Sequence, residues 1–124
     1  MTKYSLWEAK NEERAEVMAT LVEHLQRWIG QTVEVKIQLT QRYSIGDYDR
    51  HGTTSTYFEF KLDYVGIAFS GAKLMLLDDA ERASLEAFTD IFVELLIEET
   101  KVIFVEKHKG NIGRRITIDL SSTK

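Results

Sequence analysis

The sequence contains no cysteine and no proline among its 124 residues. Without cysteine the chain forms no disulfide, no thiolate metal site and no cysteine nucleophile. Long apolar runs are also missing: the densest stretch, residues 91–97, is interrupted by Glu94, whereas a membrane-spanning helix needs about 18–20 apolar residues. The N-terminal segment lacks the apolar core of a signal peptide. We therefore expect a soluble cytoplasmic protein with no cofactor and no membrane contact.

What the sequence does contain is typical of a folded protein. Hydrophobic residues make up 44% and charged residues 29%, which is too apolar for a disordered chain. The length fits one domain, residues 1–124, better than two. The net charge of −4 is unevenly spread, because residues 78–99 carry −7 and residues 100–124 carry +4. An acidic segment directly followed by a basic one indicates charged surfaces that could bind a partner.

Two segments show the apolar spacing of a helix. A capping-box pattern begins at Ser5, apolar side chains then recur every three or four residues, and Gly30 supplies a stop. This pattern predicts a helix over residues 5–29. A second capping pattern at Asp78 precedes Leu85, Phe88 and further apolar residues at helical spacing. It predicts a helix over residues 79–98.

The other segments alternate between apolar and polar residues, as half-buried strands do. Alternation over residues 33–39 and 58–64 predicts a hairpin with Ile37 opposite Leu62, Leu39 opposite Phe60 and Lys36 opposite Asp63. Residues 102–105 and 116–120 predict two more strands, joined by the turn at 109–113.

The apolar phase changes near Gly66, where Val65, Ile67 and Phe69 become the apolar side and a Ser-Gly turn leads to Leu74 and Leu76. Two interpretations remain open. A β-bulge at Gly66 could turn this set toward the same core. Otherwise the strand runs straight, and the set forms an apolar patch that needs a partner.

Together these patterns predict an α+β fold. Two amphipathic helices would pack on one face of an antiparallel sheet of about five strands, in the order α-β-β-β-α-β-β. The apolar arc of the second helix is wider than one sheet face requires, so we expect it to contact a second subunit as well. The predicted oligomer patch comprises Val65, Ile67, Phe69, Leu74, Leu76, Val93 and Ile97.

The second predicted helix would carry an acidic ridge at i,i+4 spacing. Like charges at that spacing oppose helix formation by a few tenths of a kcal/mol per pair. The ridge is either a solvated outer face or a docking strip for a basic protein partner. Its members are Glu86, Asp90, Glu94 and Glu98.

The basic C-terminal hairpin is a candidate nucleic-acid contact, through Lys107, Lys109, Arg114 and Arg115. Its turn formally matches a GXXG loop, but predicted strands flank it where that loop joins helices. Few aromatic residues accompany the basic ones, which favours a solubilising hairpin tip over base stacking.

No segment carries a recognisable catalytic signature. The loop from Asp47 to Gly52 echoes a calcium loop, yet the expected oxygen donors are replaced by His51 and Phe58. Asp47 or Asp49 could pair with His51 in acid–base chemistry, but no third group is visible. His24 fits the edge of a helix stripe. We expect no catalytic residue and no metal site.

The leading functional hypothesis is a non-enzymatic protein-binding or regulatory module, such as a small inhibitor or adaptor, acting as a homodimer. The alternative is a nucleic-acid-binding domain that uses the basic hairpin. Charge segregation and the apolar patches carry the first hypothesis.

Overall fold

The computed structural model describes residues 2–5, 11–45, 48–68, 73–78, 83–88, 92–108 and 112–120. Strands dominate these residues. In chain order the elements are β1 (Thr2–Ser5), α1 (Asn11–Gln26), β2 (Thr32–Ile45), β3 (Tyr48–Lys61), β4 (Tyr64–Ala68), β5 (Lys73–Leu77), β6 (Ala83–Phe88), β7 (Phe92–Ile97), β8 (Lys101–His108) and β9 (Ile112–Leu120).

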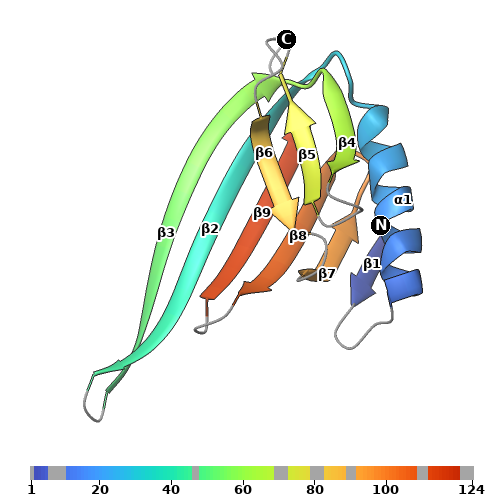
Figure 1. The fold of residues 1–124 in the computed structure, drawn as a ribbon. Coiled ribbons are helices and arrows are strands. Elements are labelled where there is room, and N and C mark those ends of the chain that lie inside the picture. Colours follow the sequence, from blue (N-terminus) through green and yellow to red (C-terminus); the bar gives the residue numbers. More distant parts are fainter. Residues whose placement is uncertain are drawn as a thin grey trace.

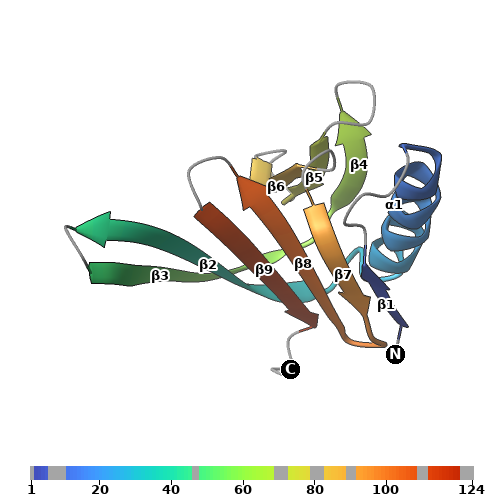
Figure 2. The same ribbon diagram turned by 90° about the horizontal axis from the view of Figure 1, so that it is seen from below.

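The strands form two antiparallel sheets that lie one over the other (Figures 1 and 2). The larger sheet has six strands in the order β1-β7-β8-β9-β2-β3, and the smaller has three in the order β4-β5-β6. The long β2–β3 hairpin extends past the other strands at one end of the larger sheet (Figure 1). Helix α1 lies beside β4 and the β1 end of that sheet (Figure 2).

One cluster of buried side chains lies between the two sheets and α1. The larger sheet contributes alternate residues such as Val35, Phe104 and Ile118, and α1 contributes Leu21 and Leu25. Because side chains alternate between the two faces of a strand, this inner face of the six-stranded sheet is apolar. We call the opposite face of that sheet the outer face.

The first predicted helix is confirmed in kind but begins later. Helix α1 starts at Asn11, and residues 2–5 form β1, which pairs with β7. Asn11 is a residue type favoured at helix N-termini, so the start signal at Ser5 was the wrong one. The end is confirmed, because Gly30 adopts a φ of 92° beyond the last turn.

The second predicted helix is wrong, and with it the predicted α+β fold. Residues 83–88 and 92–97 are the strands β6 and β7. The buried residues on them alternate: Leu85 with Ala87, and Leu95 with Ile97. A register irregularity between Phe92 and Glu94 interrupts the alternation along β7. Because of this interruption, the apolar residues of the segment also fit the spacing of a helix. The described chain is therefore mostly β, with one helix and two sheets.

The predicted hairpin is confirmed, but its register is wrong. Ile37 faces Thr56, and Val33 faces Phe60. The predicted strands, residues 33–39 and 58–64, leave a connection between them that is too long, because β2 reaches Ile45 and β3 resumes at Tyr48. The shorter connection shifts the register, so each residue of β2 faces a different residue of β3 from the predicted one. The shift keeps Val33, Val35 and Phe58 on the same face.

The phase change near Gly66 has a cause that neither interpretation included. Gly66 pairs regularly with Met75, so the predicted bulge is wrong. The chain instead leaves one sheet at Lys61 and enters the other at Tyr64, across Leu62 and Asp63. A strand that changes sheets restarts its alternation, and this places Val65 in the core.

We expect Gly30→Ala to lower the free energy of unfolding by about 1 kcal/mol or more, because L-residues rarely adopt its φ of 92°. Space is not the reason, since a Cβ at Gly30 would meet nothing within 4 Å. Gly113 is equally open but lies in a strand without a positive φ, so Gly113→Ala is the matched control. Urea denaturation measures both, and an equal response would contradict the backbone argument.

Candidate functional site

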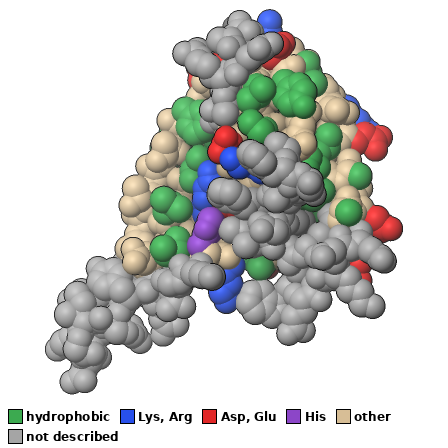
Figure 3. Space-filling view, in the orientation of Figure 1, with side chains coloured by type: hydrophobic (Ala, Val, Ile, Leu, Met, Phe, Trp, Pro, Cys, Tyr) green, Lys and Arg blue, Asp and Glu red, His purple; other side chains and the backbone are tan. Residues whose placement is uncertain are grey.

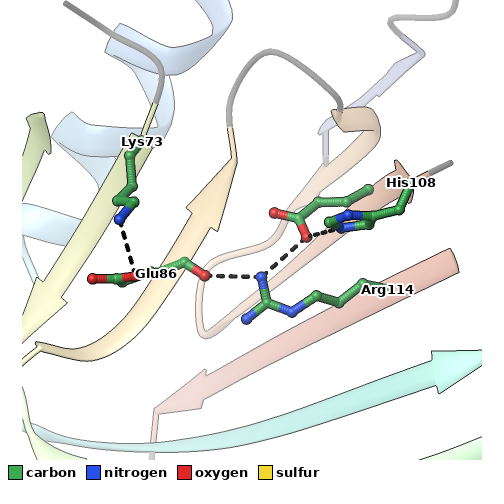
Figure 4. Close-up of polar contacts among 5 residues, drawn as sticks. Lys73, Glu86, His108 and Arg114 are labelled. Atoms are coloured by element: carbon green, nitrogen blue, oxygen red, sulfur yellow. Dashed lines mark hydrogen bonds and ion pairs between the residues drawn. The ribbon is translucent and has the colours of Figure 1, made fainter. Parts of the chain in front are cut away.

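Five polar side chains join the two sheets in an inter-sheet polar cluster (Figure 4). Arg114 of β9 donates through Nη1 to Glu106 Oε1 on β8 at 3.0 Å and to the backbone oxygen of Glu86 on β6 at 2.9 Å. The Glu86 carboxylate accepts from Lys73 Nζ on β5 at 3.1 Å. His108 Nε2 lies 3.0 Å from Glu106 Oε1. The cluster therefore runs from the smaller sheet to the larger one.

Glu106 is the unusual member, because its side chain is 0% exposed. It follows Val102 and Phe104 at the inward positions of β8, and Arg114 precedes Ile116 and Ile118 on β9. Register places Glu106 directly opposite Arg114. A buried carboxylate is tolerated only when it is paired and hydrogen-bonded, and here a guanidinium and an imidazole supply those bonds.

The sequence interpretation missed this pair. The alternation of Val102, Phe104 and Glu106 shows that Glu106 occupies an inward position, and the same argument applies to Arg114. The sequence pattern therefore contained the information that Glu106 and Arg114 point inward. Both residues lie in the basic segment over residues 100–124, which had been interpreted as a surface.

The cluster holds the sheets together and offers little for chemistry. Figure 3 shows acidic, basic and histidine side chains gathered in the middle of the face that carries the smaller sheet. Their hydrogen bonds are directed at one another. Within the part of the chain that the structure describes, no three His, Asp or Glu side chains are grouped to hold a metal ion.

The predicted acidic ridge does not form, because its residues lie on different elements. Glu86 lies on β6 in an ion pair with Lys73, Glu94 is exposed on β7, and Glu98 follows the end of β7. Asp90 lies outside the described residues. Residues four apart share a face on a helix but not across two antiparallel strands.

The predicted oligomer patch is largely a core. Val65, Leu74, Leu76 and Ile97 are buried within the chain, and Val93 is half-buried. Ile67 remains 40% exposed, and Phe69 lies outside the described residues. The smaller sheet packing on the larger one covers the side chains that seemed to need a partner.

The basic hairpin is confirmed as β8 and β9, but its charges do not point one way. Arg114 turns inward to Glu106, Lys107 and Arg115 are exposed, and Lys109 lies outside the described residues. A phosphate-binding surface needs its cations available to solvent. The structure thus removes one of the four predicted contacts.

The loop considered for calcium or acid–base chemistry is mostly strand. Asp49 and His51 are residues of β3, at register positions opposite Ser44 and Arg42, while Asp47 lies outside the described residues. His24 is half-buried on α1, with its ring 5.2 Å from that of Trp28.

A groove lies on the outer face where β2, β3 and β9 run side by side. Its hollow of about 390 Å³ is open to solvent. The lining residues are Glu34, Val35, Lys36, Tyr57, Phe58, Glu59, Thr117 and Asp119. Six of them occupy outward positions, while Val35 and Phe58 belong to the inward set. No sequence pattern had indicated this groove, since its residues come from three separate strands.

The groove combines negative charge with an exposed aromatic ring. Glu34 faces Glu59 on one side and Asp119 on the other, so three carboxylates cross adjacent strands in one row. Like charges at directly opposite positions destabilise a sheet. Tyr57 is 68% exposed, and Lys36 Nζ lies 5.5 Å from its ring centroid. Two lysines of the chain already contact this surface, Lys36 at the ring and Lys101 at Asp119 (3.8 Å), so the groove accommodates cations that touch a carboxylate or a ring.

Over the residues that the structure describes, the fold defines the class only broadly, as mostly β with two sheets and one helix. The part of the chain that the structure describes contains no helix that is long and apolar enough to cross a membrane. Comparisons with protein-family models, with curated proteins and with solved structures found no match.

Proposed function

We propose that the chain is a non-enzymatic protein-binding module that holds a basic segment of a partner protein in the outer groove. The observation that supports this proposal is the exposed Tyr57 ring beside the row of Glu59, Glu34 and Asp119. Lysine and arginine bind such surfaces through charge-assisted hydrogen bonds and through contact with the ring face.

The shape of the groove favours a polypeptide over a small molecule. Small ligands are usually bound in concave sites that bury most of their surface, whereas this groove is open along the sheet. Its floor is formed by three extended strands, so a partner segment lying along it could place several side chains. Occupying a partner in this way is how an inhibitor or adaptor acts without chemistry of its own.

The test is fluorescence anisotropy with a labelled peptide of alternating arginine and alanine, beside a glutamate–alanine peptide of the same length. We expect the arginine peptide to bind, with affinity that falls as salt rises. Tyr57→Ala and Glu34→Gln should each weaken binding about tenfold, which corresponds to losing one central contact.

The matched control is Glu23→Gln. Glu23 is an exposed carboxylate on α1, a helix that contributes no residue to the groove, and it is paired with Arg27 at 3.8 Å. It changes the net charge by the same amount as Glu34→Gln. Equal losses for both variants would reduce the binding to general charge attraction and would contradict the proposal. Preference for an oligonucleotide over the arginine peptide would contradict it as well.

A further inference from the structure

Strand β3 ends the larger sheet with an unusually long edge. It pairs with β2 over all 14 residues without a register shift. Among the strands that the structure describes, none pairs with its other side. Residues 53–57 of this edge are exposed. Sheet edges are normally shortened, bulged or interrupted by proline or lysine, because an open edge is a template for another strand; in β3 the single lysine stands at the last position.

We infer that β3 pairs antiparallel with β3 of a second copy, about a two-fold axis at Ser55. The inference rests on the open edge of β3 and not on the proposed function, although Tyr57, Phe58 and Glu59 of this strand also line the groove. In a two-fold antiparallel pair, residues whose numbers add to twice the central number face each other. Centring on Ser55 pairs residues 49–61 completely.

The charges of the strand support this register. It sets Lys61 opposite Asp49 of the partner, which is a pair of opposite charges, and Glu59 opposite His51 of the partner, where an imidazole N–H can donate to the carboxylate. These four positions share the outward alternation of Tyr57. Opposite charges at facing positions stabilise an antiparallel pair, and like charges destabilise it.

Neighbouring registers lose this complementarity. Facing residues of two paired strands lie on the same side of the sheet, so the two-fold axis must lie at a residue and not between two residues. The neighbouring registers are therefore centred on Thr54 and on Thr56. Centring on Thr54 places Glu59 opposite Asp49, which are like charges. Centring on Thr56 places Lys61 opposite His51 and shortens the paired length.

The uncharged positions also fit the Ser55 centre. Thr54 faces Thr56 of the partner, a pair that can form cross-strand hydroxyl bonds. Phe58 faces Gly52, and an aromatic side chain opposite an edge glycine compensates for the missing side chain. In a two-fold symmetric dimer the same strand of both copies forms the interface. The sequence of β3 complements itself in this way, so the expected partner is a second copy of the chain.

A cysteine placed at the axis tests the inference. The sequence has no cysteine, so Ser55→Cys introduces the only thiol, and two facing Cβ atoms would lie about 4.5–5.5 Å apart, within reach of a disulfide. Thr53→Cys is the matched control on the same face, since two such cysteines would be separated by four residues, about 13 Å. Both positions are exposed.

The test uses mild oxidation at concentrations where the unmodified chain sediments as a dimer. Under these conditions we expect Ser55→Cys to form a disulfide-linked dimer and Thr53→Cys to form no crosslink. Lys61→Glu should weaken the dimer about five- to tenfold, and adding Asp49→Lys should restore it. Circular dichroism would show that each variant is folded.

Three results would overturn the inference. The first is a monomer at high micromolar concentration in sedimentation equilibrium. The second is crosslinking of Thr53→Cys as readily as of Ser55→Cys. The third is a dimer whose affinity ignores Lys61→Glu. None of these depends on peptide binding, so the outcome is separate from that of the groove experiment.

Discussion

Replacing Arg114 with methionine should lower the free energy of unfolding by about 3–5 kcal/mol. The reason is the position of Glu106, whose side chain is 0% exposed and accepts from Arg114 at 3.0 Å. Without the guanidinium, the buried carboxylate would lose its 3.0 Å ion pair with Arg114, although the contact with His108 would remain. The backbone oxygen of Glu86 would lose a donor at the same time. Urea denaturation followed by far-UV circular dichroism measures the change.

A double-mutant cycle separates this pairing from general damage. Glu106→Met should also destabilise the chain, but combining it with Arg114→Met should recover much of the loss, because two apolar side chains replace two buried charges. Arg115→Met is the control, since Arg115 is the exposed next residue; it should change stability by about 0.5 kcal/mol or less. Losses that simply add in the double variant would contradict a coupled pair.

Leu76→Ala should destabilise the chain by about 2–5 kcal/mol, as large-to-small substitutions in a packed core do. Leu76 is 0% exposed on the central strand of the smaller sheet, although its sequence pattern had placed it in an oligomer patch. Ile67→Ala, on the neighbouring strand, is the control: its side chain is 40% exposed, and we expect a loss of about 1 kcal/mol or less.

Thermal and urea denaturation would distinguish the two positions, and sedimentation velocity would follow the oligomeric state of both variants. Small, equal losses accompanied by dissociation of a dimer would mean that these side chains meet another subunit. A large loss at Leu76 alone would place them between the two sheets of one chain.

Local patterns predicted those parts of the fold that local interactions decide. The turn that follows α1 and closes at Gly30 reflects a backbone preference, and the β8–β9 hairpin follows from simple alternation. The segment from Leu85 to Ile97 fits both a helical and a strand period. Pairing of β6 with β5 and of β7 with β8 and with the distant β1 decides between them. Pairing context of this kind commonly overrides a local pattern.

The candidate sites show the same division. Glu106 and Arg114 were predictable in principle, because inward alternation on two strands joined by a short turn brings them together. The groove was not, because Glu34, Tyr57 and Asp119 meet only once β9 has joined β2. Neither the hairpin pattern nor the charge distribution indicates which strand fills that side of β2.

The strand order has a consequence for how the chain is made. β2 can pair with β3 as soon as both strands have been translated, yet its other side pairs with β9, which follows only after β4 to β8. β1 likewise must wait for β7. Pairings between such distant segments slow folding, because loop closure precedes any gain in contacts. On the ribosome, the nascent β2–β3 hairpin therefore has one unpaired side until β9 emerges, and a chaperone that shields extended segments should bind during that interval.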